Sequence, residues 1–296
     1  MQVDGHTIEV SSERKVLFPA AGLTKGDLAR HYRDVAAAML PHVRGRPVTL
    51  MRYPRGVDQP GFVQQAAPED PPDWVRTVVV EKEEGGALTR LTIENAATLV
   101  WLAHLNAVTP HVWLSRTDRL HHPDRLVFDL DPATDDFEPV RRAAFALRDL
   151  LDELGLPAFV MTSGSRGLHV TIPLDRSAAF DAARVFARAV AEELARRRPE
   201  ALTVEQRKAE RGARLYLDVM RNAYGQTAVP PYAVRARPEA PVATPLRWEE
   251  LDDPALHARR FTITNVPERL AEHGDPWAEI DAHAVPVIEA ARTLRA

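Results

Sequence analysis

The sequence predicts a fold of the mixed α+β (or α/β) class, in which helices pack on β-sheet. Segments with apolar residues at helical spacing alternate irregularly with short apolar runs typical of strands. The 296 residues, 45% of them hydrophobic, are enough for one large or two small domains with a substantial core. The sequence has no internal repeat and no low-complexity segment. The order of its individual elements therefore sets the expected architecture.

The N-terminal part begins with a predicted helix over residues 24–40. Thr24 and Asp27 have the spacing of a capping box, apolar residues follow at helical spacing, and Pro41 should end the helix. The segment 54–72 is so rich in proline and glycine that it should be mostly loop. Two strands and a second helix are also expected here: 48–51, 75–80 and 94–105.

The rest of the chain alternates strands with two long helices. Gly155 is a natural stop for the first helix, 139–154, and the second, 177–198, is amphipathic. Prolines favour extended backbone over 227–245, and the remainder should be helical. Short apolar runs predict four strands: 126–130, 158–162, 168–173 and 215–219. Side chains expected to point inward are Phe180, Val185, Ala189 and Leu194 of the second long helix and the anchors Trp248 and Trp277.

The composition indicates a protein of a reducing compartment. The chain has no cysteine, which excludes disulfides, thiolate catalysis and cysteine-ligated zinc. No apolar run reaches membrane-spanning length and the acidic, polar N-terminus does not resemble a signal peptide, so we expect a cytoplasmic protein without a membrane partner. The net charge of -4 favours a small-molecule enzyme, and any contact with DNA would have to come from local basic patches.

Two acidic residues lie at the end of a predicted buried strand. Asp129 and Asp131 are two residues apart, so both carboxylates should project from one face, with Phe128 and Leu130 on the other. Adjacent carboxylates repel each other unless a divalent cation neutralises them, and oxygen ligands suit magnesium or manganese. Asp218, on a separate predicted strand, could complete the set. The alternative is a strand-end turn in which Asp129 has an ordinary polar partner.

A glycine-containing turn, 162–169, joins two predicted strands. Its glycines allow consecutive amides to form a nest for phosphate oxygens, and Ser163 and His169 add side-chain donors. The alternative is an ordinary serine-glycine hairpin. His111 lies shortly before the acid-bearing strand and is a further candidate. His121 and His122 should instead face solvent, because adjacent residues on a strand point to opposite faces and rarely bind one metal together.

Basic residues gather around the third acid. A cluster of this kind can clamp a triphosphate or a nucleic-acid backbone, although charge runs are also typical of solvated surfaces. Its members are Arg207, Lys208, Arg211, Arg214, Arg221, Arg235 and Arg237. A second basic set flanks the first helix and could reach a phosphate: Arg14, Lys15 and Lys25.

Four of these motifs, taken in order, closely resemble the polymerase domain of bacterial ligase D, which belongs to the archaeo-eukaryotic primase superfamily. They are Phe128 to Pro132, Thr162 to His169, Leu217-Asp218, and Gln226 to Arg237. The resemblance extends from Lys15 to Leu251, which is nearly the whole chain.

The resemblance implies one primase-polymerase domain over residues 1–296. Its fold would have two sheet-containing halves flanking a central active-site cleft, with helices packed outside. DNA-end contacts would come from about residues 1–120 and catalysis from 121–245, with a C-terminal helical segment over 246–296. No ligase or nuclease domain is expected, because the signature lysine motif and the required length are missing.

The resemblance also implies roles for individual residues. Two manganese or magnesium ions would be bound by the catalytic acids Asp129, Asp131 and Asp218. The incoming nucleotide would be held by Ser163, His169 and Arg235, with His111 close to the metals or the sugar. Arg52 and Phe62 would also bind the nucleotide. The lysines Lys15 and Lys25 would bind a DNA 5'-phosphate, and Arg211 would position template or primer.

The implied activity is the template-directed addition of nucleotides to primer 3' ends. The family typically prefers ribonucleotides and fills gaps or repairs double-strand breaks by non-homologous end joining. We therefore expect a nucleoid location, with gapped or broken DNA, nucleoside triphosphates, Ku and an ATP-dependent DNA ligase as partners.

Two positions depart from the family pattern. Met51 stands where some relatives have a phosphate-contacting lysine, so Arg52 could substitute for that lysine. Phe62 is followed by Val63, whereas some relatives have two successive aromatic residues. Loss of one aromatic ring should weaken base stacking at this position.

Two other functions are compatible with parts of the sequence. Phe-Asp-Leu-Asp resembles the start of haloacid-dehalogenase phosphatases, which would make the protein a metal-dependent phosphoesterase, but Thr134 lies one place later than that motif requires. A non-catalytic adaptor that binds DNA ends is the third hypothesis. The three clustered acids argue against it, because a scaffold without metal has no electrostatic reason to keep them together.

Overall fold

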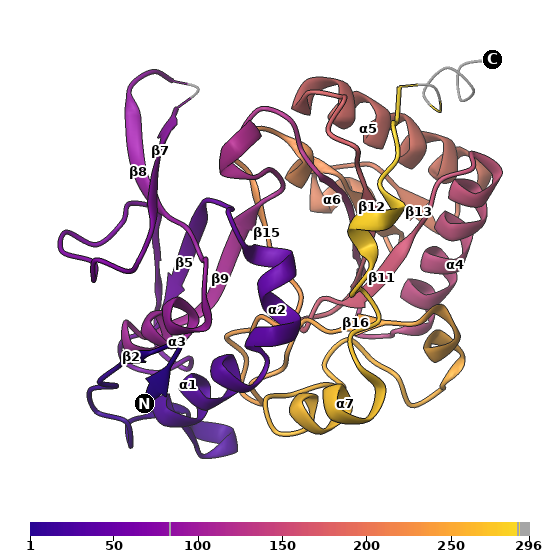
Figure 1. The fold of residues 1–296 in the computed structure, drawn as a ribbon. Coiled ribbons are helices and arrows are strands. Elements are labelled where there is room, and N and C mark those ends of the chain that lie inside the picture. Colours follow the sequence, from indigo (N-terminus) through magenta and orange to yellow (C-terminus); the bar gives the residue numbers. More distant parts are fainter. Residues whose placement is uncertain (83, 289, 291–296) are drawn as a thin grey trace.

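The computed structural model describes residues 1–82, 84–288 and 290. Two halves, each built around its own sheet, lie side by side (Figure 1). The smaller sheet has the strand order β15 (Thr227–Ala228), β9 (Ala107–Trp113), β5 (Val48–Arg52) and β6 (Phe62–Gln64). The predicted mixed class and the two sheet-containing halves are therefore confirmed.

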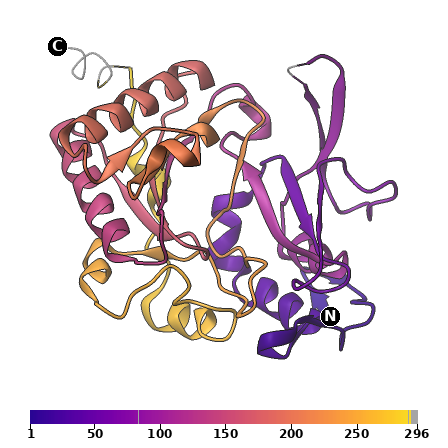
Figure 2. The same cartoon turned by 180° about the vertical axis from the view of Figure 1, so that it is seen from behind.

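The larger sheet has six strands and carries the acidic motif at its centre. Its strand order is β13 (Leu202–Thr203), β14 (Leu215–Asp218), β10 (Arg125–Asp131), β12 (Leu168–Pro173), β11 (Phe159–Thr162) and β16 (Pro245–Leu246). The helices α4 (Glu138–Glu153) and α5 (Phe180–Arg197) pack against it on the outside of the molecule (Figures 1 and 2). Their apolar faces and the buried residues of the strands form one continuous core.

The smaller sheet is covered by the N-terminal helices. These are α1 (Lys25–Asp34), α2 (Ala36–Val43) and α3 (Ala96–His104). Two short strand pairs precede α1, namely β1 (Gln2–Val3) with β2 (His6–Thr7), and β3 (Val16–Phe18) with β4 (Leu23–Thr24). A hairpin of β7 (Thr77–Glu81) and β8 (Ala87–Leu91) projects from this half (Figures 1 and 2). Within the described residues, no helix is long and apolar enough to span a membrane.

The first predicted helix is in fact two. The capping box of Thr24 and Asp27 is present, but the chain leaves the helix at Val35, whose ψ of -1° lies outside the helical range. Pro41 does not end the second helix, because α2 continues to Val43. Proline has a helical φ, but it removes one backbone hydrogen bond and crowds the carbonyl four residues back, and α2 ends two residues after Pro41. The strands β6, β8 and β9 were also missed, and β6 lies inside the segment predicted to be loop.

The inward face of α5 was assigned partly wrongly. Val185 is 53% exposed, and the buried stripe instead contains Ala183, Phe186 and Val190. Five residues correspond to about 140° around a helix, so Val185 cannot share a face with Phe180.

The C-terminal remainder is less helical than predicted. Besides α7 (Val266–His273), its described residues form two short 3-10 helices, η4 (Trp248–Asp252) and η5 (Ile280–His283). The anchors are confirmed, because the indole nitrogens of Trp248 and Trp277 donate to the carbonyls of Ala158 and Val160 at 2.8 and 3.2 Å. These bonds hold the segment against β11. The predicted helical segment 246–296 ends in residues 291–296, which lie outside the described residues.

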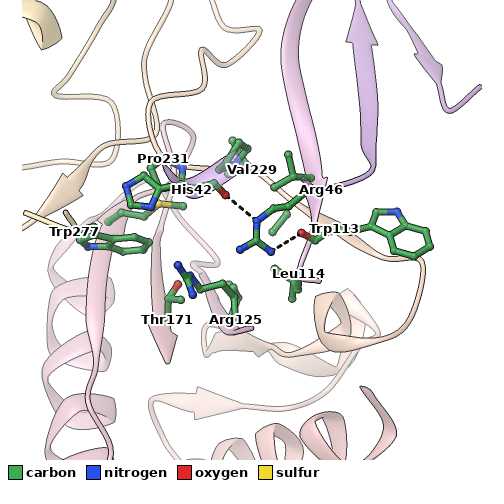
Figure 3. A pocket seen from close by; sticks show the side chains of 14 residues that line it. His42, Arg46, Trp113, Leu114, Arg125, Thr171, Val229, Pro231 and Trp277 are labelled. Atoms are coloured by element: carbon green, nitrogen blue, oxygen red, sulfur yellow. Dashed lines mark hydrogen bonds between the residues drawn. The ribbon is translucent and has the colours of Figure 1, made fainter. Parts of the chain in front are cut away.

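Buried charges join the two halves at a small cavity of 40 Å³ (Figure 3). Arg46, only 1% exposed, donates to the carbonyls of His42 and Trp113 at 2.8 and 3.2 Å. Its guanidinium also pairs with Asp124 at 2.6 Å. Asp124 directly precedes β10, so this network fixes the start of the acid-bearing strand relative to α2.

A buried histidine predicts how the stability of the protein depends on pH. His31 is 2% exposed, and its Nε2 lies 3.0 Å from the Tyr232 carbonyl. Burial lowers the pKa of His31 to about 4, although the Tyr232 carbonyl and Asp34 oppose the shift. Between pH 6.5 and 4 the unfolded chain therefore binds more protons than the folded protein, so stability falls as the pH falls through this range.

We expect His31 alone to lower the free energy of unfolding by about 2 kcal/mol between pH 7 and pH 5. Urea unfolding at the two pH values measures this change. His31→Gln retains a donor for the carbonyl but does not titrate, so its stability should change by about 2 kcal/mol less over the same interval. Equal pH dependence of the two proteins would contradict the assignment.

Candidate active site

Three side chains form a row across the middle of the larger sheet. In the antiparallel register, Asp129 of β10 lies opposite Asp218 of β14 on one side and opposite His169 of β12 on the other. Directly opposed residues share a face, with Cβ atoms about 5 Å apart. Asp218, the third acid expected from the sequence, is therefore a direct neighbour of Asp129. Phe128 and Leu130 are fully buried in the core behind the strand, as predicted.

The electrostatic surroundings of Asp129 favour its charged form. His169 Nε2 lies 3.5 Å from its carboxylate. Burial works to raise the pKa of Asp129, but His169, Arg221 and Arg235 outweigh burial and hold the pKa below its usual range. Asp129 is thus an anion that faces a group of cationic and imidazole side chains. His169 Nδ1 is buried and has no hydrogen-bond partner among the described residues.

Asp131 lies on the same face and is paired with two arginines. Arg166 and Arg211 approach its carboxylate at 2.8 and 3.2 Å. Arg211 also donates to the carbonyls of Glu205 and Gln206 at 2.9 and 2.8 Å, and its guanidinium lies 3.8 Å from the ring centre of Tyr216. The structure therefore places Arg211 against the acids.

The glycine turn between β11 and β12 carries Ser163 and receives Arg235. The Ser163 hydroxyl accepts from the amides of Ser165 and Gly167, both at 3.2 Å. Arg235 donates to the Ser163 carbonyl at 3.2 Å. Gly164 has φ of +64°, and a Cβ there would lie 2.7 Å from Cγ of Arg235. This turn thus holds the guanidinium beside the acids because residue 164 has no side chain.

His111 of the smaller sheet faces the same place. Burial lowers the pKa of His111 to about 3, and the charges of Arg235, Arg221 and His169 add to the effect. His169 and Arg221 come from the half with the larger sheet, so the His111 imidazole lies where the two sheets meet. Its neutral form could donate to or accept from a ligand there.

Arg221 belongs to the basic cluster seen in the sequence but was not predicted as a site residue. Only its closeness to Asp129 and His111 in space reveals it.

The three acids fit a divalent cation in chemistry and in strand position. Among the described residues, no three acidic or histidine side chains already converge as they would around a bound ion. The reason lies in part with Asp131, whose carboxylate is turned toward Arg166 and Arg211. The backbone nevertheless brings three oxygen-donor side chains to one face of two paired strands, which suits magnesium or manganese.

Comparison with known proteins decides the family. The model of the LigD primase-polymerase domain matches residues 24–277. The multifunctional non-homologous end joining protein LigD of Mycobacterium bovis is 37% identical over 94% of this chain. A solved polymerase domain from Mycobacterium tuberculosis ligase D, in complex with DNA, superposes with a TM-score of 0.89 at 36% identity and covers 94% of this chain and 99% of that one.

This chain belongs to the LigD primase-polymerase family. The resemblance seen in the sequence is thereby confirmed. The chain spans 37% of the M. bovis relative and 43% of the bifunctional LigD of Bacillus subtilis, which is 32% identical over 91% of this chain.

The predicted DNA-end residues of this LigD-type domain lie together in the N-terminal half. The Lys25 amide donates to the Lys15 carbonyl at 2.8 Å, and Lys15 Nζ donates to the carbonyl of Pro54. Lys25 is 3% exposed, and burial, Lys15 and Arg52, in that order, lower its pKa. Arg52 thus lies near the two lysines, although it was predicted to bind the nucleotide.

The two departures from the LigD pattern meet in the structure. Met51 of β5 pairs with Val63 of β6, and Arg52 pairs with Phe62, so the two pairs lie on opposite faces of the sheet. Arg52 donates to the Leu105 carbonyl at 2.8 Å, and its guanidinium lies 5.3 Å from the Phe62 ring centre. Arg52 therefore cannot take the place of a lysine at position 51 without leaving these partners.

If the glycine turn binds a nucleotide, Gly164→Ala should weaken that binding more than it weakens the fold. The new Cβ collides with Arg235 and lies 3.1 Å from the Ala243 amide, so the guanidinium must move. We expect KM for the nucleotide to rise about tenfold or more, in steady-state primer extension, since one charge-assisted contact is worth about 1.5–3 kcal/mol.

Gly155→Ala is the matched control for this substitution. Gly155 has φ of +67°, and a Cβ there has no neighbour within 4 Å. Both substitutions impose the same backbone strain, about 1–2 kcal/mol, but only the first should change KM. A similar rise in KM for the two variants would mean that strain, and not Arg235, is responsible.

Proposed function

We propose that this chain is a metal-dependent nucleotidyltransferase, a primase-polymerase that extends nucleic-acid 3' ends at gaps or breaks in DNA. The observation that carries the proposal is the row His169, Asp129 and Asp218 across three paired strands. Beside it, the glycine turn holds Arg235. Membership of the LigD family supports this activity and favours it over the phosphoesterase and adaptor hypotheses.

The reaction joins a primer to a nucleotide without a covalent protein intermediate. The primer 3'-oxygen attacks the α-phosphorus of a nucleoside triphosphate, a new P–O bond forms, and the bond to pyrophosphate breaks. The proton of the 3'-hydroxyl passes to solvent. Arg235, Ser163 and His169 would hold the triphosphate from the turn and the neighbouring strand, and His111 would approach it from the other sheet.

Asp129, Asp131 and Asp218 would hold two divalent cations, manganese or magnesium. Such ions make the hydroxyl easier to ionise and stabilise the charge that develops on pyrophosphate. Asp131 has to release Arg166 and Arg211 when it binds an ion, and both arginines are then available to phosphates nearby. Arg211 would in this way take up its predicted role on template or primer.

The N-terminal half would bind the DNA strand whose 5'-phosphate borders the gap. Lys15 and Lys25 present two cations to a 5'-phosphate, and Arg52 lies close enough to add a third. Phe62 is 47% exposed and could stack on a base. Together with a preference for ribonucleotides, this arrangement suits gap filling in end joining at the nucleoid, beside Ku and an ATP-dependent ligase.

Primer extension on a gapped duplex tests the proposal. The wild-type chain, manganese and labelled nucleotides should yield extended primers, with ribonucleotides incorporated more efficiently than deoxyribonucleotides. A gap with a 5'-phosphate should be filled better than one without. Release of phosphate from small esters without extension would favour the phosphoesterase, and DNA binding without any turnover would favour the adaptor.

Metal removal gives a further expected result. Chelation by EDTA should abolish extension completely, because unneutralised carboxylates repel the triphosphate, and added manganese should restore it. Manganese should also raise the thermal unfolding midpoint of the wild-type chain, since a ligand that binds the folded state stabilises it. Extension that persists in excess chelator would contradict the assignment of the acids.

A further inference from the structure

A second pocket lies along the β7–β8 hairpin, from Arg90 to the turn residues Lys82 and Glu84, and takes no part in the proposed reaction. It has a volume of 310 Å³. Gln65, Arg90 and Trp113 line it from the N-terminal half, and Tyr224 to Gln226 close it from the segment that follows the third acid. The Tyr224 hydroxyl donates to the Glu81 carbonyl at 3.3 Å and so ties that segment to the hairpin.

Arg90 is a buried cation that has no counter-ion among the described residues. The residue is 6% exposed and forms no ion pair with any described residue. It donates to the Thr49 hydroxyl at 2.8 Å and to the Gln65 side-chain oxygen at 3.0 Å, and its Nε has no partner in the part of the chain that the structure describes. Burial lowers the pKa of Arg90, yet arginine keeps its charge in proteins. A buried charge held only by neutral partners is unfavourable until an anion reaches it.

Trp113 gives a second, independent indication that the pocket binds a ligand. Its indole is 1% exposed, and its Nε1 is buried without a partner within residues 1–82, 84–288 and 290. The Arg90 guanidinium lies 5.4 Å from the indole ring centre. Two unpartnered donors thus line one pocket, and a ligand that satisfies them has to supply acceptor oxygens.

The position of the pocket indicates which oxygens these are. Trp113 follows His111 by two residues on β9, so both side chains lie on the same face of the smaller sheet. Thr49, which orients Arg90, pairs directly with His111. The pocket therefore lies on the same face of the smaller sheet as His111 and extends that face away from the acids. At 310 Å³ between a hairpin and a loop, it has room for the backbone of one strand and not for a duplex.

We propose that Arg90 binds a backbone phosphate of the single-stranded template next to the reacting base pair. The proposal rests on the polymerase function argued above. Lys82 on the rim is opposed by Glu81 and Glu84, so the attraction comes from the buried guanidinium. Gln65 and Gln226 add amide groups that suit the sugar or base of the same nucleotide.

Binding of two DNA duplexes tests the proposal. One has a 5' single-stranded template overhang beyond the primer end, and the other is blunt. We expect Arg90→Gln to weaken binding of the overhang duplex about tenfold in fluorescence anisotropy, with the blunt duplex unaffected. The slope of log K against log salt should decrease by about 0.7 for the overhang duplex, as for one lost single-strand phosphate contact. Arg76→Gln, an exposed arginine beside the same hairpin, should change neither.

A chemical version of the experiment gives its main result with the wild-type chain alone. Single methylphosphonates, which are uncharged, are placed along the overhang and tested with the wild-type chain. One position should weaken binding about tenfold, and the same substitution should have no further effect with Arg90→Gln. If no single overhang phosphate matters, the proposal is wrong.

Two other results would also overturn it. Equal weakening of both duplexes by Arg90→Gln, with a lowered unfolding midpoint, would show that Arg90 only supports the hairpin. A raised KM for the nucleotide at saturating DNA would assign the phosphate to the nucleotide. A wild-type chain that extends primers but shows no overhang effect overturns only this inference, whereas a chain that extends none contradicts the proposed function.

Discussion

Asp129→Asn should lower the rate of primer extension at least about 1000-fold, equivalent to about 4 kcal/mol of transition-state stabilisation. Asp129 is the centre of the row, with Asp218 and His169 directly opposite it. Its charge therefore acts on every group of the proposed site. Asparagine keeps the shape of the side chain but cannot neutralise a divalent cation. Single-turnover extension with saturating DNA and nucleotide measures the chemical step directly.

Asp118→Asn is the matched control for the loss of a carboxylate. Asp118 is an exposed acid that pairs with Arg176 at 2.8 Å, outside the row. It should extend primers at the wild-type rate. Circular dichroism and the unfolding midpoint should be unchanged for both variants. If the Asp129→Asn protein retains a tenth of the wild-type rate, the acids do not have the proposed role in the reaction.

Arg46→Met should lower the free energy of unfolding by about 3–5 kcal/mol, because it leaves the buried Asp124 without its closest partner. Burial works against the charge of Asp124, but Arg46, Arg125 and Arg116 outweigh it and hold the pKa of Asp124 well below its usual range. When one arginine is removed, the unfavourable burial of the charged Asp124 is no longer fully compensated. Urea unfolding at pH 7 gives the change.

Arg119→Met serves as the control for Arg46→Met. Arg119 is exposed in the connection between the two halves, and its substitution should change stability by less than about 0.5 kcal/mol. A change below about 1 kcal/mol in Arg46→Met would show that the remaining arginines hold Asp124 without it. In that case the junction drawn in Figure 3 does not depend on this pair.

The local patterns of the sequence predicted much of the site because the relevant rule is local. Alternation along a strand put Asp129 and Asp131 on one face and Phe128 and Leu130 on the other, and the structure agrees. The order of four motifs also identified the family, since each motif keeps its residues close together in the chain. The prediction that Val185 of the long helix α5 points inward was wrong, because its position around the helix differs from that of Phe180 by about 140°.

Contacts between distant segments were decided only by the tertiary structure. Sequence spacing cannot reveal that Asp218 lies opposite Asp129, that Arg211 pairs with Asp131, or that Arg52 belongs with the lysines. The buried and unpaired state of Arg90 is equally invisible, because burial depends on what the rest of the chain packs over a residue. The sequence by itself determined which chemical groups are available and which face of each strand they occupy. The register between strands and the approach of the two sheets decided which of those groups meet, because these are set by packing across long loops and not by neighbours in the chain.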